Sequence, residues 1–144
     1  YTGMRVAIIG SGPSGLAAAD ALARKGHEVV VFEKNVNFGG LLRYGIPDFK
    51  LKKSVIERRL DVLSSSGITF EGGVQIGVDI SAEYLKRKFD ALCICAGTQV
   101  PRALAPNVEG RACFSRSNFW RRKTASYRAK RRSSPSARRT KTCL

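Results

Sequence analysis

Residue types that build metal centres and disulfide frameworks are scarce in this sequence. Its 144 residues include four cysteines and a single histidine, His27. Cys93 and Cys95 lie two positions apart in an apolar run, where a strand would point both side chains to one face. Metal sites usually need CxxC pairs or clustered histidines. We therefore predict no metal site, and we interpret these thiols as buried apolar side chains in a reducing compartment.

Long hydrophobic runs are also missing. No stretch approaches the roughly 20 consecutive apolar residues that a membrane span needs. The first apolar run, from Val6 to Ile9, ends at Gly10 and does not continue as a signal peptide. We therefore expect a cytoplasmic protein with no membrane partner. The chain begins at Tyr1 and not at Met, so we also expect a fragment or a processed product.

Acidic residues are absent from the last quarter of the chain. Residues 1–110 hold 14 Lys and Arg against 11 Asp and Glu, which leaves a net charge of +3. Residues 111–144 hold 12 Lys and Arg and no acid, and so carry most of the total of +15. Such a segment, with few apolar residues, cannot bury a core. We predict one folded domain over 1–110 and a disordered basic tail over 111–144.

Two explanations of the basic tail remain open. The abrupt change in composition favours out-of-frame translation after a frameshift or a mis-predicted splice, which sequencing the transcript across codons 105–120 would test. Alternatively, the clustered Lys and Arg bind nucleic-acid phosphates, with Trp120 or Tyr127 stacking on bases. No recognised nucleic-acid module accompanies the tail, so nucleic acid is a partner only if the tail itself is functional.

Residues 1–110 alternate between strand and helix patterns, as α/β proteins do. The β-branched runs at 5–9 and 28–32 are typical of parallel strands buried on both faces. Between them an Ala-rich helix is predicted over 16–25, and Gly26 ends it. The remaining predictions are a loop over 35–48, helices over 51–66 and 81–88, and strands over 68–71, 74–78 and 91–96. The predicted fold class is a Rossmann-type parallel sheet.

A glycine-rich turn joins the first strand to the first helix and reads Gly10-Ser11-Gly12-Pro13-Ser14-Gly15. Gly10 permits a tight turn, Gly12 lets the backbone approach a pyrophosphate, and Gly15 lets the helix pack closely. The helix N-terminus then offers unpaired N–H groups and a partial positive charge to the phosphates. Strand, glycines, helix, second strand and terminal acid occur in the order that this motif requires. We therefore predict a dinucleotide-binding site.

Glu33 ends the second predicted strand, 18 residues after Gly15, and can accept hydrogen bonds from ribose hydroxyls. A carboxylate there would repel a 2′-phosphate, so the site should hold the adenosine of FAD or NAD rather than that of NADP. The motif does not choose between FAD and NAD. An NAD-binding Rossmann domain of another dehydrogenase therefore remains an alternative.

Three segments together resemble the glutamate synthase small (β) subunit and its relative dihydropyrimidine dehydrogenase. They are the glycine turn with Glu33, the run Gly39-Gly40-Leu41-Leu42-Arg43-Tyr44-Gly45-Ile46-Pro47-Asp48-Phe49-Lys50-Leu51, and the stretch from Phe89 through Gly97-Thr98 to Pro101-Arg102. The second segment is far more specific than the glycine motif. The resemblance spans about residues 4–111.

The resemblance implies the FAD-binding, glutathione-reductase-like half domain of an oxidoreductase. In such enzymes NAD(P)H reduces FAD, and electrons leave through iron–sulfur clusters to a partner subunit or domain, here a large glutamate synthase subunit. No residue is assigned to catalysis, because hydride chemistry belongs to the cofactor. The cofactor-binding residues that it implies, with those of the glycine motif, are Gly10, Ser11, Gly12, Pro13, Ser14, Gly15, Glu33, Lys34, Gly40, Leu41, Lys50, Ile76, Ala96, Gly97 and Thr98.

The sequence also departs from the family pattern. Ala103 stands where members usually have an acid after the Pro-Arg pair, and the iron–sulfur and NADPH-binding domains of the family are not represented. We therefore expect the FAD-binding part alone, catalytically incomplete by itself. A non-functional truncated product and a nucleic-acid-binding protein that uses the tail are the other function classes left open.

Overall fold

The fold was analysed in a computed structural model that describes residues 1–98. The predictions for residues 99–144, including the basic tail and Ala103, lie outside the described residues. Strands and helices alternate along the described part, from the N-terminus to the last strand. Their bounds are β1 (Arg5–Ile9), α1 (Pro13–Arg24), β2 (Glu28–Glu33), α2 (Gly40–Tyr44), α3 (Lys53–Ser65), β3 (Thr69–Gly72), α4 (Ala82–Lys88) and β4 (Ala91–Ile94).

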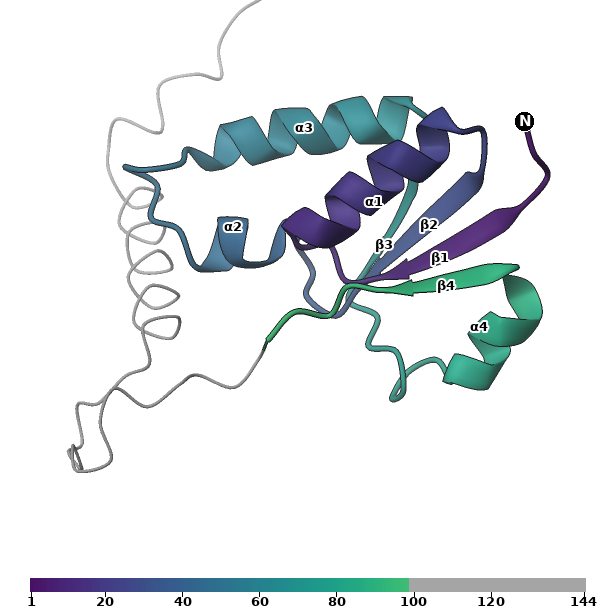
Figure 1. Cartoon of the computed structure of the whole chain (residues 1–144). Coiled ribbons are helices and arrows are strands. Elements are labelled where there is room, and N and C mark those ends of the chain that lie inside the picture. Colours follow the sequence, from purple (N-terminus) through teal and green to yellow (C-terminus); the bar gives the residue numbers. More distant parts are fainter. Residues whose placement is uncertain (99–144) are drawn as a thin grey trace, which may run out of the picture.

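The four strands form one parallel sheet in the order β3-β2-β1-β4. In its register Ile8 of β1 stands beside Val31 of β2 and Cys93 of β4. Because all strands run the same way, their carboxyl ends meet at one edge of the sheet, where α1 begins and α2 lies (Figure 1). In open α/β sheets ligands bind beyond this carboxyl edge, so it is the edge to search for a site.

Helices cover both faces of the sheet, with α1 and α3 on one face and α4 on the other (Figure 1). The first face forms a continuous core in which Leu16 of α1 and Leu63 of α3 pack on Ile8 and Val31. On the second face Leu85 of α4 packs on alternate strand residues. This two-sided burial explains why β1 and β2 are apolar runs without polar alternation. The predicted Rossmann-type fold class is confirmed.

Two local predictions are wrong. The stretch predicted as a loop over 35–48 contains the short helix α2, whose N-cap Gly39 has a φ of 112° that no β-branched residue would adopt. The predicted strand over 74–78 is a turn, with one isolated bridge between Ile76 and Ile80. In α3, Ile56 is buried in the core, whereas the neighbouring Val55 is exposed.

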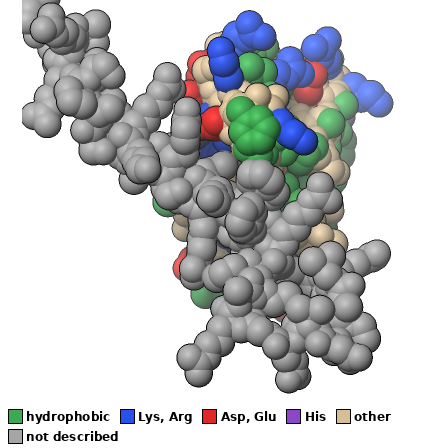
Figure 2. Space-filling view, turned by 90° about the vertical axis from the view of Figure 1, so that its left-hand side faces the viewer, with side chains coloured by type: hydrophobic (Ala, Val, Ile, Leu, Met, Phe, Trp, Pro, Cys, Tyr) green, Lys and Arg blue, Asp and Glu red, His purple; other side chains and the backbone are tan. Residues whose placement is uncertain are grey.

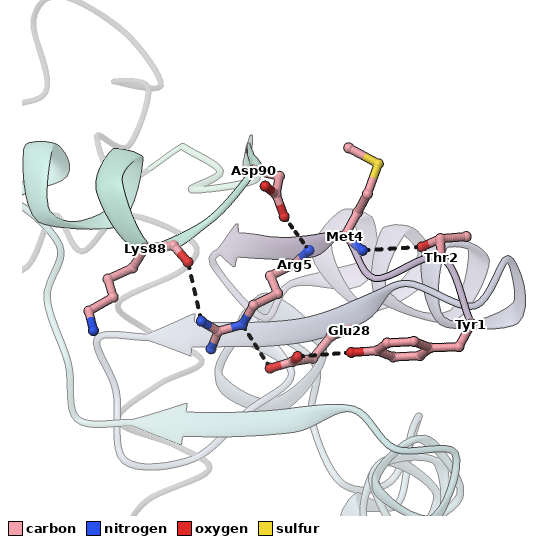
Figure 3. Close-up of polar contacts among 7 residues, drawn as sticks. All are labelled: Tyr1, Thr2, Met4, Arg5, Glu28, Lys88 and Asp90. Carbon is pink, nitrogen blue, oxygen red and sulfur yellow. Dashed lines mark hydrogen bonds and ion pairs between the residues drawn. The ribbon is translucent and has the colours of Figure 1, made fainter.

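The amino edge of the sheet is held by Arg5, which connects three chain segments (Figure 3). Its backbone N–H donates to Asp90 Oδ2 at 2.6 Å, and its guanidinium donates to Glu28 Oε1 at 3.0 Å and to the Lys88 carbonyl at 3.3 Å. The guanidinium also lies over the Phe89 ring, 5.2 Å from its centroid. These contacts join β1 to β2 and to the α4–β4 connection at the edge opposite the glycine turn.

Lys and Arg side chains gather at the top of the face seen in Figure 2, at the level of α3. Arg58 and Arg59 of α3 are exposed, and Arg59 pairs with Asp20 of α1 at 2.7 Å. These are the contacts of a solvated helix surface. Within residues 1–98, no helix combines the length and the apolar composition needed to cross a membrane.

Candidate dinucleotide-binding site

The glycine turn follows β1 directly and leads into α1. Gly10 has a φ of +105°, and a Cβ added there would lie 2.4 Å from the Cys95 carbonyl oxygen. A Cβ on Gly15 would lie only 1.9 Å from the carbonyl oxygen of Gly10. Neither position can take a larger residue without a backbone shift. Gly10 and Gly15 therefore bring the start of α1 against the ends of β1 and β4.

Gly12 differs from these two glycines. Its φ of −66° is open to any residue, and a Cβ there would meet nothing within 4 Å. The first turn of α1 contains no acidic residue, and Pro13 has no N–H. Among residues 1–98 the backbone N–H groups of Gly12, Ser14 and Gly15 donate to no acceptor. The helix end therefore presents open space and unpaired donors, the two features that an anion requires.

Glu33 at the end of β2 is buried, with 6% of its surface exposed, and its carboxylate is fully hydrogen-bonded. Oε2 accepts from the Ser11 backbone N–H at 3.0 Å and from the Ser11 hydroxyl at 2.6 Å. Oε1 accepts from the Asn35 backbone N–H at 3.0 Å and from its side-chain amide at 2.6 Å. An ionised carboxylate has about four acceptor sites, so these bonds use all of them.

Two opposing effects set the ionisation of Glu33. Burial raises its pKa, and the hydrogen bonds from Ser11 and Asn35 lower it. The net direction is downward from the ordinary value of 4.5, so the carboxylate is charged at neutral pH. A negative charge is thus held at the sheet edge beside the helix N-terminus.

Ser11 connects the glycine turn to the α2 segment. The residue is fully buried, and both its hydroxyl and its carbonyl oxygen accept from the Gly39 N–H at 3.1 Å. A Cβ on Gly40 would lie 2.9 Å from the Cα of Gly12, so the two backbones touch at the start of α2. The structure therefore brings together Gly12, Glu33 and Gly40, which are separated by up to 28 positions in the sequence.

Two buried cations fix the α2 segment on α3. Arg43 donates to the Phe38 carbonyl at 2.8 Å and pairs with Glu57 of α3 at 3.3 Å. Lys53 at the start of α3 donates to the carbonyls of Leu42 and Ile46. These are acceptors at the end of α2 and in the turn that follows it, and a short helix leaves such carbonyls unpaired.

Asp48 completes this cluster. Its Oδ1 is buried and 3.6 Å from the Lys53 ammonium, an ion pair without a hydrogen bond. Arg43 and Lys53 each expose only 6% of their surface. Buried charges of this kind must be paired and hydrogen-bonded to be tolerated, and both are. Together they hold the segment after Gly40 in one position.

The other predicted cofactor-binding residues are mostly exposed. Ala96 lies next to Gly10, since its Cα is 3.3 Å from a Cβ added there. Pro13, Ser14, Lys34, Leu41, Lys50, Gly97 and Thr98 are exposed. Ile76 packs on the face covered by α4, with Val30 and Phe32 among its neighbours. Among the described contacts, none joins Lys50 or Ile76 to the glycine turn. Their cofactor roles stay predictions.

The sequence analysis missed Asn35, Arg43 and Lys53 as structural parts of the site. A signal for Lys53 exists, because it stands three, seven and ten positions before Ile56, Leu60 and Leu63, on the buried side of α3. Asn35 lies two residues after the terminal acid, the spacing of a local side-chain turn. Arg43 carries no periodic signal, since α2 has only five residues.

The two cysteines near the site are free thiols and only half-buried, less than predicted for core residues. They do share one face, with sulfurs 3.7 Å apart. Burial and the adjacent Cys95 raise the pKa of the Cys93 thiol. The Ser14 hydroxyl lies 3.5 Å from the Cys95 sulfur. Within residues 1–98, no group of three or more metal-ligating side chains occurs.

A family model described as an NAD(P)-binding Rossmann-like domain matches residues 8–91, more than half of the chain. The chain belongs to this family. The match runs from β1 to the start of β4 and includes the glycine turn, Glu33 and α2.

Curated relatives confirm the resemblance to glutamate synthase small subunits. The Bacillus subtilis glutamate synthase [NADPH] small chain is 53% identical over 110 residues, which cover 76% of this chain and 22% of that protein. The glutamate synthase [NADH] of Saccharomyces cerevisiae is 48% identical over 110 residues, 76% of this chain and 5% of that protein. The glutamate synthase [NADH] of Schizosaccharomyces pombe is 45% identical over 128 residues, which cover 87% of this chain and 6% of that protein. This match therefore extends beyond residue 110.

This chain therefore spans less than a quarter of the length of each of these relatives.

Solved structures share its fold. FprA from Mycobacterium tuberculosis in complex with NADPH matches with a TM-score of 0.64 at 28% identity, over 76% of this chain and 25% of that one. A 2-naphthoyl-CoA reductase matches with a TM-score of 0.59 at 26% identity, over 70% of this chain and 15% of that one.

Proposed function

We propose that residues 1–110 are the FAD-binding part of a glutamate synthase-like NAD(P)H oxidoreductase. The observation that carries this proposal is the open N-terminus of α1. At Gly12 the backbone is bare, three N–H groups there lack acceptors within residues 1–98, and a charged carboxylate stands at the end of the neighbouring strand. This arrangement fits a dinucleotide pyrophosphate with an adjacent ribose.

Different residues would bind the pyrophosphate and the ribose of the dinucleotide. The N–H groups of Gly12, Ser14 and Gly15 would donate to the pyrophosphate, and the helix dipole would favour its negative charge. Glu33 would accept from a ribose hydroxyl. Because its four acceptor sites are already used by Ser11 and Asn35, a ribose must share or replace one of these bonds. The side-chain amide of Asn35 is the donor that can move away without changing the backbone.

The flavin end of the cofactor would extend over the start of α2 and over the residues that follow β4. Gly40 already abuts Gly12, so Gly40 and Leu41 stand where a cofactor leaving the glycine turn would pass. Ala96, Gly97 and Thr98 follow the end of β4 on the other side of the turn. FAD, when bound, supplies the hydride acceptor. The chain orients it, and the Arg43 and Lys53 contacts keep the α2 segment in place.

The larger assembly is inferred from the relatives. The similarity to a separate small chain in one species and to a segment of a much longer enzyme in another supports a partner that is either a large subunit or a further domain. NAD(P)H as the reductant and iron–sulfur clusters as the exit for electrons belong to that full-length context. On this proposal the chain alone binds FAD but completes no turnover.

NAD binding by another kind of dehydrogenase is the competing function, and the name of the matching family favours it. The glycine turn and Glu33 suit the adenosine half of either cofactor. The buried negative charge of Glu33 counts against a 2′-phosphate, so NADP should bind this site least well.

Cofactor titration of the purified full chain tests the proposal. FAD binding is followed by flavin fluorescence and by calorimetry, and NAD and NADP are titrated in parallel. We expect saturable binding of one FAD per chain, with weaker binding of NAD and weakest of NADP. Binding of NAD but not FAD would favour the dehydrogenase alternative. Binding of neither would refute the site.

A pair of variants shows whether binding uses the glycine turn. Gly12→Val fills the open space without backbone strain, because φ at Gly12 is −66°. It should leave the far-ultraviolet circular dichroism unchanged and weaken FAD binding by more than about tenfold, or 1.4 kcal/mol. Ala17→Val, at an exposed position of the same helix, is the matched control and should bind FAD normally.

A further inference from the structure

Cys93 and Cys95 form a pair of thiols that the dinucleotide site does not use. Cys93 lies in β4 and Cys95 directly follows it, and both pack on the core face covered by α1 and α3 while staying half-buried. Their sulfurs are 3.7 Å apart. Within residues 1–98, β4 pairs with β1 alone and ends the strand order. The pair thus offers two soft ligands at one accessible place.

The separation of the sulfurs matches one edge of a tetrahedral metal site. Zinc binds thiolates at about 2.3 Å in tetrahedral geometry, which places two such sulfurs about 3.8 Å apart. The observed separation of 3.7 Å, at which the two thiols form a hydrogen bond, is close to this value. A disulfide fits less well, because it needs Cβ atoms about 3.5–4.5 Å apart. Residues two apart on a strand are separated by roughly 6.6 Å, so the strand would have to bend.

Contrary to the sequence-based prediction of no metal site, we propose that Cys93 and Cys95 form a two-thiolate site for a soft divalent metal ion of the Zn²⁺ and Cd²⁺ class. The metal displaces the two thiol protons, which pass to solvent. Within residues 1–98 no third metal-ligating side chain joins the pair, and water or an external thiolate can complete the four-coordinate shell. Thiolate sulfur selects this class of ion over Mg²⁺ and Ca²⁺.

The site is separate from the proposed pyrophosphate contacts but adjoins them. The Cys95 backbone N–H donates to the Ile9 carbonyl at 2.8 Å, and its Cβ lies 3.5 Å from the position of a Cβ on Gly15. The Ser14 hydroxyl donates to the Cys95 sulfur at 3.5 Å, so it is a hydrogen-bond partner of one proposed ligand. The proposal stands whether or not the chain binds FAD.

Cadmium titration of the full chain tests the site. Cys113 and Cys143 are first replaced by serine, so that only the proposed pair remains. Under reducing conditions we expect one Cd²⁺ per chain and an ultraviolet sulfur-to-metal charge-transfer band. Cys93→Ser or Cys95→Ser should weaken Cd²⁺ binding by more than about tenfold, since even the loss of an indirect partner of a ligand costs roughly 10- to 100-fold. Ser54→Ala, at an exposed position of α3, is the control and should leave Cd²⁺ binding unchanged.

Three results would overturn the proposal. They are the absence of the charge-transfer band in the Cys113→Ser/Cys143→Ser chain, a stoichiometry of one Cd²⁺ per two chains, and unchanged affinity in both single-cysteine variants. A second measurement covers variants that fail to fold. In the unsubstituted chain, one equivalent of Cd²⁺ should protect Cys93 and Cys95 together from alkylation, as read by peptide mass spectrometry. Protection of only one of them would also refute the site.

Discussion

Replacing Glu33 by glutamine should destabilise the domain much more than a surface substitution does. The carboxylate accepts four hydrogen bonds, two from Ser11 and two from Asn35, in a buried position. A glutamine of the same shape keeps one oxygen and turns an NH₂ group toward two donors. The Ser11 hydroxyl or the Asn35 amide can rotate to accept from it, but one backbone N–H is left without a partner.

The size of the effect follows from these bonds. A buried donor without an acceptor costs about 1–3 kcal/mol, and each remaining bond loses roughly 1 kcal/mol of its charge assistance. Relief from burying a charge offsets part of this loss. We expect Glu33→Gln to lower the free energy of unfolding by about 2–4 kcal/mol, a large share of the roughly 5–15 kcal/mol of a typical domain.

Urea unfolding of the full chain at pH 7, followed by circular dichroism, measures this difference. The pH dependence gives a second test. The pKa of Glu33 is lowered on folding, so its stabilisation is fully present above its ordinary value of 4.5 and is lost as the pH falls from there through the folded pKa. Wild type should lose this stability in acid, and Glu33→Gln should not. A loss below about 0.5 kcal/mol at pH 7, with parallel acid profiles, would refute the hydrogen-bond argument.

Three further predictions concern other parts of the structure. Gly15→Ala places a Cβ 1.9 Å from a carbonyl oxygen, so it should lower the free energy of unfolding, measured in urea, by about 3 kcal/mol or more. Gly12→Ala adds a Cβ in open space and should lower it by almost nothing. Equal losses in the two variants would contradict the packing argument. Lys53→Met removes the hydrogen bonds to two carbonyls, so hydrogen exchange should speed up in residues 40–50, with protection largely restored in Lys53→Arg. Arg5→Met should cost only about 0.5–1.5 kcal/mol and leave FAD affinity unchanged, because its ion pair is exposed and lies at the opposite sheet edge. A loss of FAD binding would contradict that placement.

The parts of the fold that the sequence predicted are those with a strong periodic or turn signal. The strands at 5–9 and 28–33 are buried on both faces, so nearly every residue in them had to be apolar. Gly10 and Gly15 were predicted because a Cβ at either would collide with backbone, a constraint that acts within a few residues of the turn. The predicted strand at 74–78 failed because Val74 and Ile76 pack against the α4 core from a turn, and an apolar pattern alone does not reveal backbone pairing.

The α2 segment shows why the rest of the site could not be predicted. A five-residue helix has almost no periodic signal, and its stability comes from tertiary contacts rather than from its own hydrogen bonds. Those contacts are made by Arg43 and Lys53, residue types that are exposed in most proteins. Here each is buried because it finds backbone carbonyls and an acidic partner. Such a cation is recognisable only when its acceptors are known. The contact of Gly40 with Gly12, which joins the two halves of the proposed FAD site, lies at the start of the segment that these two charges hold.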